Sequence, residues 1–435
     1  MGVPIAPIIM QPFEDLVKET AREEGMPYER FIYVPTPVSS QPRSVVKKYL
    51  EGNDPVTGKP VMQEIIDALT KPLTSEEAHS GPIPSVKEDP RIIGPDTEEN
   101  LRQLFMNKGW TDGLPIILPT EERVAAMLKG TSHKPDEVVG KMSAGPHPAR
   151  QYTVEKVAVN AVMAGCKPEY FPVVLALASS AFASTSTSTT SFARMAVVNG
   201  PIAKEIGMNS GIGALSPWGL NQANATSGRA WTLITLNLSG MKPGVSYWGS
   251  QGNNLNYNNI FFAENEAASP WEPYHVQKGA KKEESVISVF SGRSFTSTQA
   301  MTSNWKWEMI QTSKAFYPSP GSGLTLLVDP LIVREWMNDP DFNTKEKVSE
   351  WLYENTTLDA KHYKAVSFSY SFAKPQAEEG VEPYASWYKL PDDALIKFLG
   401  SPDNVNIIVV GGGTQAFGYA LDFSYVGKAS IDKWR

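Results

Sequence analysis

The stretch VPIAPIIMQPFEDLVKETAREE (residues 3–24) joins a short apolar run to a segment whose apolar side chains recur at helical spacing. A second apolar run, FIYVP (31–35), and a second helical pattern, KPVMQEIIDALTKPL (59–73), follow it. Short apolar runs are typical of buried strands, and longer periodic segments are typical of amphipathic helices. This strand–helix–strand–helix order predicts a small parallel α/β unit over residues 1–73. Because two strands rarely stand alone, we expect the unit to be part of a larger sheet.

The rest of the chain predicts a linker and a second, larger domain. Residues 74–97 are rich in proline and charge and lack periodicity, which indicates a linker or a strap across the surface. Residues 98–435 alternate helical and strand patterns, without a repeat of 20–50 residues, and predict a larger mixed α/β domain. Helices are predicted at 98–109, 120–130, 153–166, 168–182, 227–240, 330–338, 344–355 and 391–400. Strands are predicted at 195–201, 285–290, 323–330 and 404–413.

Composition narrows the classes of function. The 435 residues carry a net charge of −7, which argues against nonspecific nucleic-acid binding and against an anionic membrane surface. No apolar run is long enough to predict a membrane span, and the N-terminus does not resemble a signal peptide. A single cysteine excludes an internal disulfide framework. We therefore expect a cytoplasmic protein.

One stretch concentrates acid–base and aromatic side chains: FFAENEAASPWEPYH, residues 261–275. Glu264 and Glu266 alternate, so on a strand they would face the same way. Beside Trp271 in a closed site, such a carboxylate could act as a general acid or base, and Trp271 itself could contact a substrate. His275 could pair with one of the acids or share a divalent metal with both. The alternative is structural: the acids satisfy backbone donors and His275 caps a neighbouring element.

Short polar groups in glycine-rich turns form a second candidate site. Asn209, Ser210 and Asn224 lie in such turns, whose backbone N–H groups suit carbonyl or anionic substrates. Arg229 could clamp a carboxylate in bidentate fashion, and Asp112 could contact a ligand. Loop architecture alone is the competing interpretation, because asparagine and glycine tolerate left-handed turns.

Cys166 follows an apolar helix, 153–166, for which Thr153 is a plausible N-cap and Gly165 lies near the end. The negative end of the helix dipole disfavours a thiolate there, so a buried structural cysteine is the simpler interpretation. It stays a minor catalytic candidate.

Several segments of the sequence resemble a known bacterial family. DGLPIILPTEERV (112–124), TVEKVAVNAVMAGCKPEYFPVVLAL (153–177), VVNGPIAKEIGMNSGIGAL (197–215), QANATSGRAWTL (222–233), FAENEAASPWEPYHV (262–276) and IIVVGGG (407–413) resemble the larger domain that accompanies, or is fused to, the UGSC-like (seleno)protein domain. PFEDLVKETAREEGMP (12–27), FIYVPTPV (31–38) and PVMQEIIDALT (60–70) are similar to the second half of the UGSC-like domain itself.

The resemblance implies an architecture with a missing part. The family is named for a cysteine- or selenocysteine-containing motif near its start, and this chain has no such motif before the words that match. The resemblance therefore implies a separate small UGSC-like subunit that carries the reactive thiol or selenol. The chain would be the large subunit of a heteromeric, oligomeric enzyme acting on a small, anionic organic substrate by redox chemistry or reductive cleavage.

Two other functions stay open at this point. The chain could be a non-redox lyase or hydrolase that uses Glu264, Glu266 and His275 alone. It could also be a binding or scaffold subunit without chemistry, because its many aromatic side chains would serve interfaces equally well.

Overall fold

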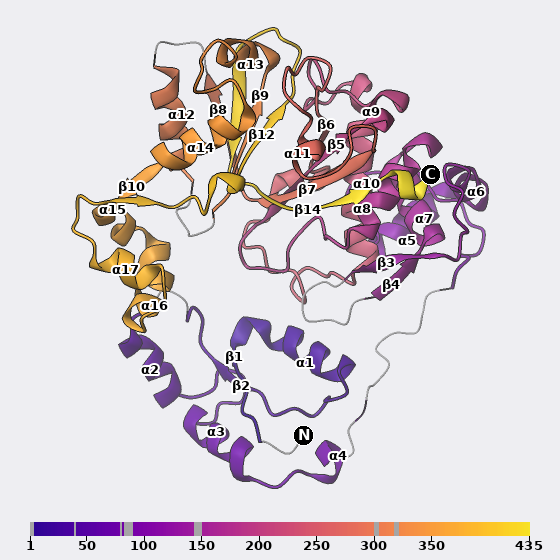
Figure 1. The fold of residues 1–435 in the computed structure, drawn as a ribbon. Coiled ribbons are helices and arrows are strands. Elements are labelled where there is room, and N and C mark those ends of the chain that lie inside the picture. The colour runs from indigo at the N-terminus through magenta and orange to yellow at the C-terminus, as the bar shows by residue number, and fades with distance from the viewer. Residues whose placement is uncertain are drawn as a thin grey trace.

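The computed structural model describes residues 4–38, 41–78, 81, 90–142, 150–299, 304–316 and 322–435. Much of the predicted linker, 74–97, lies outside these residues; within it the short helix α4 (Ser75–Ala78) is described. Figure 1 shows a small unit formed by the first helices and strands and a larger body that contains the rest. The predicted α/β class is confirmed. Every helix in the described residues is too short or too polar to cross a lipid bilayer.

The small unit has the predicted strand–helix–strand order. Strands β1 (Ile8–Met10) and β2 (Ile32–Val34) pair in parallel, and α1 (Glu14–Glu23) connects them after one 3₁₀ turn. Helix α3 (Val61–Thr70) packs Val61 against β2, as its helical pattern predicts. Sequence analysis missed α2 (Arg43–Glu51), whose pattern follows a proline-rich turn.

Two four-stranded sheets form the centre of the body, and they share one topology. In the first sheet, the order is β14–β7–β5–β6, with β5 parallel to β6 and antiparallel to β7. In the second, the order is β12–β9–β13–β8, with β9 parallel to β12 and antiparallel to β13. The strands are β5 (Ala193–Asn199), β6 (Ile260–Ala263), β7 (Val286–Gly292), β8 (Phe295–Gln299), β9 (Leu324–Val328), β12 (Val405–Val409), β13 (Phe417–Leu421) and β14 (Ser424–Ser430).

The two halves of the body exchange their last strands. The chain runs β5, β6, β7 in the first sheet and then crosses, so that β8 pairs with β13 of the second. It runs β9, β12, β13 in the second sheet and crosses back, so that β14 pairs with β7 of the first. Each half opens with a strand that runs into a helix with proline in its first turn, as VVNGPI (197–202) and LLVDPL (326–331) show. This repeat unit is much longer than 20–50 residues, so a search for short repeats does not detect it.

Alternation of side chains along the strands arranges the body in four layers. Met195 and Val197 of β5 face the second sheet, where they pack with Ile408 and Leu421, while Ala196 and Val198 face helices. Because successive residues of a strand point to opposite faces, both sheets are covered on both sides. Helices α7 (Val154–Ala164), α8 (Phe171–Ser179) and α10 (Gln222–Leu238) cover the outer face of the first sheet. Helices α13 (Pro330–Trp336) and α14 (Lys345–Asn355) cover the outer face of the second (Figure 1).

Local signals placed several elements correctly. Thr153 caps α7 by accepting a hydrogen bond from Lys156 N, and Gly165 ends it at φ 88°, a left-handed conformation that favours glycine. The remaining body helices are α5 (Glu98–Asn107), α6 (Glu121–Leu128), α9 (Pro201–Glu205), α11 (Tyr274–Gln277), α12 (Trp305–Lys314), α15 (Ala360–Ala365), α16 (Lys374–Glu378) and α17 (Tyr384–Lys389). The minor strands are β3 (Val138–Met142), β4 (Arg150–Thr153), β10 (Thr357–Asp359) and β11 (Leu395–Lys397).

The predicted helix at 391–400 is wrong. This segment forms β11, which pairs antiparallel with β10. Ile396 and Phe398 are both buried, and both Leu395 and Lys397 are exposed, which is the two-residue alternation of a strand. A window of ten residues, with Pro391 at one end and Gly400 at the other, was too short to distinguish this two-residue period from a helical one.

Substitution of Gly228, in the middle of α10, tests how closely that helix packs on the segment at the start of β6. Helix propensity alone predicts that alanine would stabilise the helix by about 1 kcal/mol. A Cβ atom on residue 228 would lie 1.9 Å from the carbonyl oxygen of Asn258, which is backbone and cannot easily move. We therefore expect Gly228→Ala to lower the free energy of unfolding by about 1–3 kcal/mol, measured by chemical denaturation.

The control is Gln222→Ala, at an exposed position of the same helix. Its free energy of unfolding is expected to stay within about 0.5 kcal/mol of wild type. A stabilised Gly228→Ala protein would show that α10 and β6 are not packed this closely.

Candidate functional site

The loops that follow β5 and β6 bring the two predicted acids together. The side-chain amide nitrogen of Asn199 donates to Glu264 Oε2 at 2.7 Å and to Glu266 Oε1 at 2.9 Å. The backbone nitrogen of Gly200 also donates to Glu266 Oε1, at 2.8 Å. The strand itself ends at Ala263, so the acids converge through Asn199 rather than through strand alternation.

Glu264 forms a buried ion pair with Lys345. Its Oε1 lies 2.9 Å from Lys345 Nζ, and both side chains are at most 2% exposed. Its Oε2 also accepts a hydrogen bond of 2.6 Å from the backbone nitrogen of Tyr274. Both carboxylate oxygens are therefore occupied by donors of the chain. Lys345 begins α14 of the second half, so the pair ties the loop of one half to a helix of the other.

His275 does not join this pair. The residue is fully buried in α11, and neither of its ring nitrogens has a hydrogen-bond partner. In the described parts of the chain, no group of three or more His, Cys, Asp or Glu side chains is arranged to hold a metal ion. The expected pairing of His275 with Glu264 or Glu266 is therefore not formed, and the described residues do not bring the three side chains together as a metal site.

Trp271 is an element of packing. Its indole nitrogen donates to the carbonyl oxygen of Asn343 at 2.9 Å. Its ring lies 6.2 Å from that of Trp336, which in turn stacks on Trp305 at 5.4 Å. Trp271 thus anchors the loop after β6 on the helices of the second half, together with Glu264.

Asn209 and Asn224 brace a loop. The Asn224 amide accepts from Asn209 N at 3.0 Å and donates to Asn209 O at 2.8 Å and to Ala214 O at 3.2 Å. The Asn209 side chain donates to Ile212 O and to Asn221 Oδ1. Ser210 contributes its carbonyl oxygen, which accepts from Gly411 N at 3.0 Å. These contacts match the structural interpretation, in which asparagines shape a turn.

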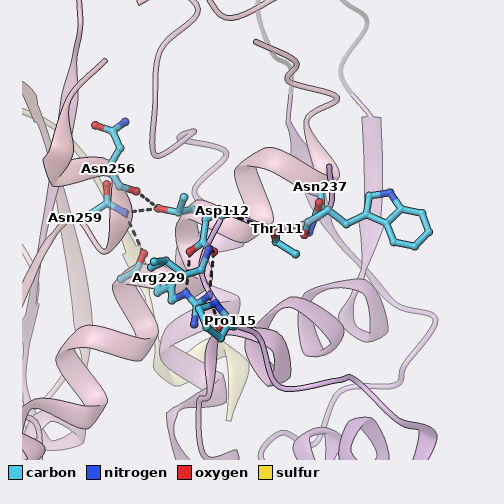
Figure 2. Close-up of polar contacts among 12 residues, drawn as sticks. Thr111, Asp112, Pro115, Arg229, Asn237, Asn256 and Asn259 are labelled. Carbon is cyan, nitrogen blue, oxygen red and sulfur yellow. Dashed lines mark hydrogen bonds and ion pairs between the residues drawn. The ribbon is translucent and has the colours of Figure 1, made fainter. Parts of the chain in front are cut away.

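Arg229 and Asp112 contact each other. Arg229 Nε and Nη2 donate to the two carboxylate oxygens of Asp112 at 2.8 and 2.9 Å, and Nη2 also donates to Pro115 O at 2.8 Å. One further residue of α10, Asn237, donates to Trp110 O at 3.0 Å. Figure 2 shows this row of contacts, which fastens the segment after α5 along α10. Arg229 therefore directs its bidentate donors at Asp112, so the two residues that were expected to contact a ligand separately form an ion pair with each other.

Cys166 has the environment of a structural thiol. Burial raises the pKa of its thiol to about 12, although a hydrogen bond with Thr226 and the charge of Arg229 act in the opposite direction. The desolvated thiolate is disfavoured, as the position after a helix C-terminus predicts.

A cavity of about 270 Å³ lies between the halves, beside the loop that Asn224 braces. Its walls come from the start of α10 and from β6 in the first half, and from β9 and β13 in the second. Exchanged strand β8 adds Phe295. Asn224 is the only predicted site residue among those that line it. Sequence reasoning missed Asn221, Asn259 and Tyr419; the asparagine pair 258–259 before a buried strand was an available signal, because asparagine tolerates left-handed turns.

A larger and more polar cavity, about 600 Å³, lies where the strands cross between the sheets. Its walls include the ion pair of Arg293 and Asp422, at 2.8 Å, and the hydroxyls of Ser291 and Ser424. Asp422 also accepts from the backbone nitrogens of Arg293 and Ser294, so it holds both crossing loops together.

The ion pair of Glu264 and Lys345 can be tested by replacing its members singly and together. Lys345→Met leaves a buried carboxylate without its cation, so we expect the free energy of unfolding to fall by about 3–5 kcal/mol. Adding Glu264→Gln to this variant removes the unpaired charge and is expected to recover part of the loss. Denaturant titration of Lys345→Met, of Glu264→Gln and of the double variant measures the coupling energy between the two side chains.

The matched control is Lys397→Met, which breaks a solvent-exposed pair with Glu354. We expect a much smaller loss there, because exposed pairs contribute little. Equal losses at the two positions, or no coupling between Glu264 and Lys345, would contradict a buried, interdependent pair.

Cys166 gives a second test, since it is the only cysteine. With its pKa raised to about 12, the thiol stays protonated at pH 8, and we expect an aromatic disulfide reagent to label the folded protein very slowly. The same reagent should label the chain rapidly in denaturant. Rapid labelling of the folded protein, followed by absorbance of the released thiolate, would overturn the structural role.

Comparison with known proteins gives no counterpart: no protein-family model, no curated protein and no solved structure matches this chain.

Proposed function

We propose that this chain is the large, substrate-binding subunit of a cytoplasmic enzyme whose thiol or selenol comes from a smaller UGSC-like polypeptide. The reaction would be redox chemistry or reductive cleavage of a small organic substrate. A reducing compartment suits such a group, because thiols stay reduced in the cytosol.

The proposal rests on the open edge of β1. Ile32 N donates to Pro7 O at 3.0 Å. In a parallel pair, the backbone N–H and C=O groups of successive residues point alternately toward the partner strand and away from it. With this register, the backbone groups of Ile8 and Met10 point away from β2. Within the described residues, β1 pairs with no strand except β2. The other edge of the sheet is different: Asp54 Oδ2 accepts from Tyr33 N at 2.6 Å and covers it. An added strand would therefore pair with β1.

The apolar surface of the small unit supports the same proposal. Met62, Ile66 and Leu69 recur along one face of α3 and are 47%, 48% and 42% exposed. The neighbouring face of α3, with Val61, Ile65 and Ala68, already packs in the small core with β2. A helix that is apolar on two faces is typical of a buried position, so this exposed face suits a protein partner.

A reactive chalcogen from outside also agrees with Cys166. The chain has one cysteine, and its raised pKa makes it a poor nucleophile at neutral pH. Thiol-dependent chemistry would therefore need a second polypeptide.

The alternatives receive less support. A lyase or hydrolase that uses Glu264 would need a free carboxylate, and both oxygens of Glu264 are engaged by Lys345, Asn199 and Tyr274. A scaffold without a ligand does not account for a cavity between the halves.

The test is co-expression with a UGSC-like polypeptide that carries a Cys-Gly-Ser-Cys-like motif. We expect the two chains to elute as one heteromeric complex in size-exclusion chromatography with light scattering. Ile66→Glu, which puts a charge in the exposed face of α3, should weaken the complex by about tenfold or more.

The control variant is Leu395→Glu, which replaces an exposed apolar side chain of the body. Both variants should melt close to wild type, because both side chains are exposed, and Leu395→Glu should leave the complex intact. Two separate peaks for the wild-type chains, or a complex that tolerates Ile66→Glu, would refute the proposed docking.

A further inference from the structure

The loop at 209–221, between α9 and α10, exposes large apolar side chains. Ile212, Leu215, Trp218 and Leu220 are 68%, 42%, 63% and 77% exposed. Phe295 of β8 is 45% exposed and lines the same cavity as Leu215, so it lies beside the loop. Single exposed apolar residues are ordinary on a protein surface, but several gathered on one surface are typical of an interaction site.

Hydrogen bonds hold this loop in one conformation. Asn221 Nδ2 donates to Gly213 O at 2.6 Å, and Asn209 Nδ2 donates to Asn221 Oδ1 at 2.7 Å. Asn224 Nδ2, at the start of α10, donates to Ala214 O at 3.2 Å. A loop that is ordered before it binds loses little conformational entropy on binding. The exposed apolar side chains are therefore presented on a rigid support.

The apolar area of this surface is close to what a dimer needs. The four loop side chains and Phe295 together expose on the order of 400 Å² of apolar surface. A standard interface buries about 800 Å² on each partner, and about 65% of a homodimer interface is apolar. The loop and Phe295 therefore supply most of the apolar part of one side of such an interface.

The absence of charge from this segment favours a second copy of the chain as the occupant. Residues 206–228 contain no charged side chain and no histidine, although the whole chain carries a net charge of −7. In a two-fold symmetric interface, residues near the axis meet their own copies, so a charged side chain there would face a like charge. A charge-free surface avoids this repulsion, whereas recognition of a different protein commonly uses opposite charges. A lipid surface fits less well, because segments that bind lipid commonly carry Lys or Arg beside their apolar residues.

We infer that two copies of this chain associate through the loop at 209–221 and Phe295, and that each copy covers the exposed apolar side chains of the other. The surface uses no residue of β1 or α3, where the smaller polypeptide is proposed to dock, so the two associations can be tested apart. Because Leu215 and Phe295 also line the cavity between the halves, the second copy would cover the cavity where these side chains reach the surface.

The test is the mass of the purified chain, without any partner, measured by size-exclusion chromatography with light scattering over a dilution series. We expect the wild-type chain to reach twice 47.7 kDa as its concentration rises. Leu220→Glu places equal charges on the two facing loops and should weaken association by about thirtyfold or more. The matched control, Leu395→Glu, makes the same change at a 68% exposed position of the body and should dimerise like wild type.

Opposite charges at one position distinguish a second copy from any other occupant. Leu220→Lys should also be monomeric alone, whereas an equimolar mixture of Leu220→Glu and Leu220→Lys should recover the dimer, because opposite charges then face each other. These variants should melt close to wild type, since Leu220 is mostly exposed. If they do not, Trp218→Ser removes a second exposed side chain of the loop and should weaken association in the same way.

Three results would overturn the inference. The wild-type chain could keep the mass of one chain up to about 100 µM, a concentration at which an interface of standard size associates. Leu220→Glu could dimerise like wild type, or the mixture of the two charged variants could stay monomeric. A monomeric wild-type chain that sediments with phosphatidylcholine vesicles would assign the loop to a lipid surface instead.

Discussion

The buried ion pair between Glu264 and Lys345 is the constraint on which the arrangement of the two halves depends. Desolvation makes each charge costly on its own, so the loop after β6 and the start of α14 must meet for either half to be stable. Asn199 and the backbone of Tyr274 supply the remaining donors, which completes the hydrogen bonding of the carboxylate. A segment rich in acid and aromatic groups, which suggests catalysis when it is read alone, is thus used to join two parts of one body.

A chain of polar groups continues through the apolar layer between the sheets. The hydroxyl of Tyr274 donates to Asn406 Oδ1 at 2.7 Å, and burial raises the pKa of that hydroxyl well above its ordinary value. Asn406 donates to Thr325 Oγ1 at 3.3 Å, and Thr325 donates to Phe423 O at 2.7 Å. Satisfied groups of this kind allow one relative position of the sheets, whereas apolar contacts alone would allow several. The strand exchange adds covalent continuity to the same seam.

The cavity beside the loop that Asn224 braces lies at this seam, between β6 of one half and β13 of the other. Its shape therefore depends on the packing that the ion pair and the polar chain maintain. The small N-terminal unit touches the body elsewhere, through Phe13 against Trp248 at 4.9 Å and through Glu19 near Lys242 at 3.8 Å. A partner that pairs with β1 would need to reach the cavity from that unit to act on a bound molecule.

The sequence by itself determined local features: the α/β class, about half of the helices, fewer than half of the strands, the cap and the end of α7, and the poor reactivity expected of Cys166. These follow from periodicity, capping residues and helix dipoles, which act over a few neighbouring residues. Only the tertiary structure decided which distant groups meet. Asp112 and Arg229 were expected to bind ligands separately, and instead they form an ion pair with each other. Glu264 was expected to pair with His275, and instead it forms an ion pair with Lys345. The members of these two pairs are 81 and 117 residues apart in the sequence, and the packing of sheets and helices brings them together. The local sequence pattern around each side chain does not indicate which distant residue it will contact.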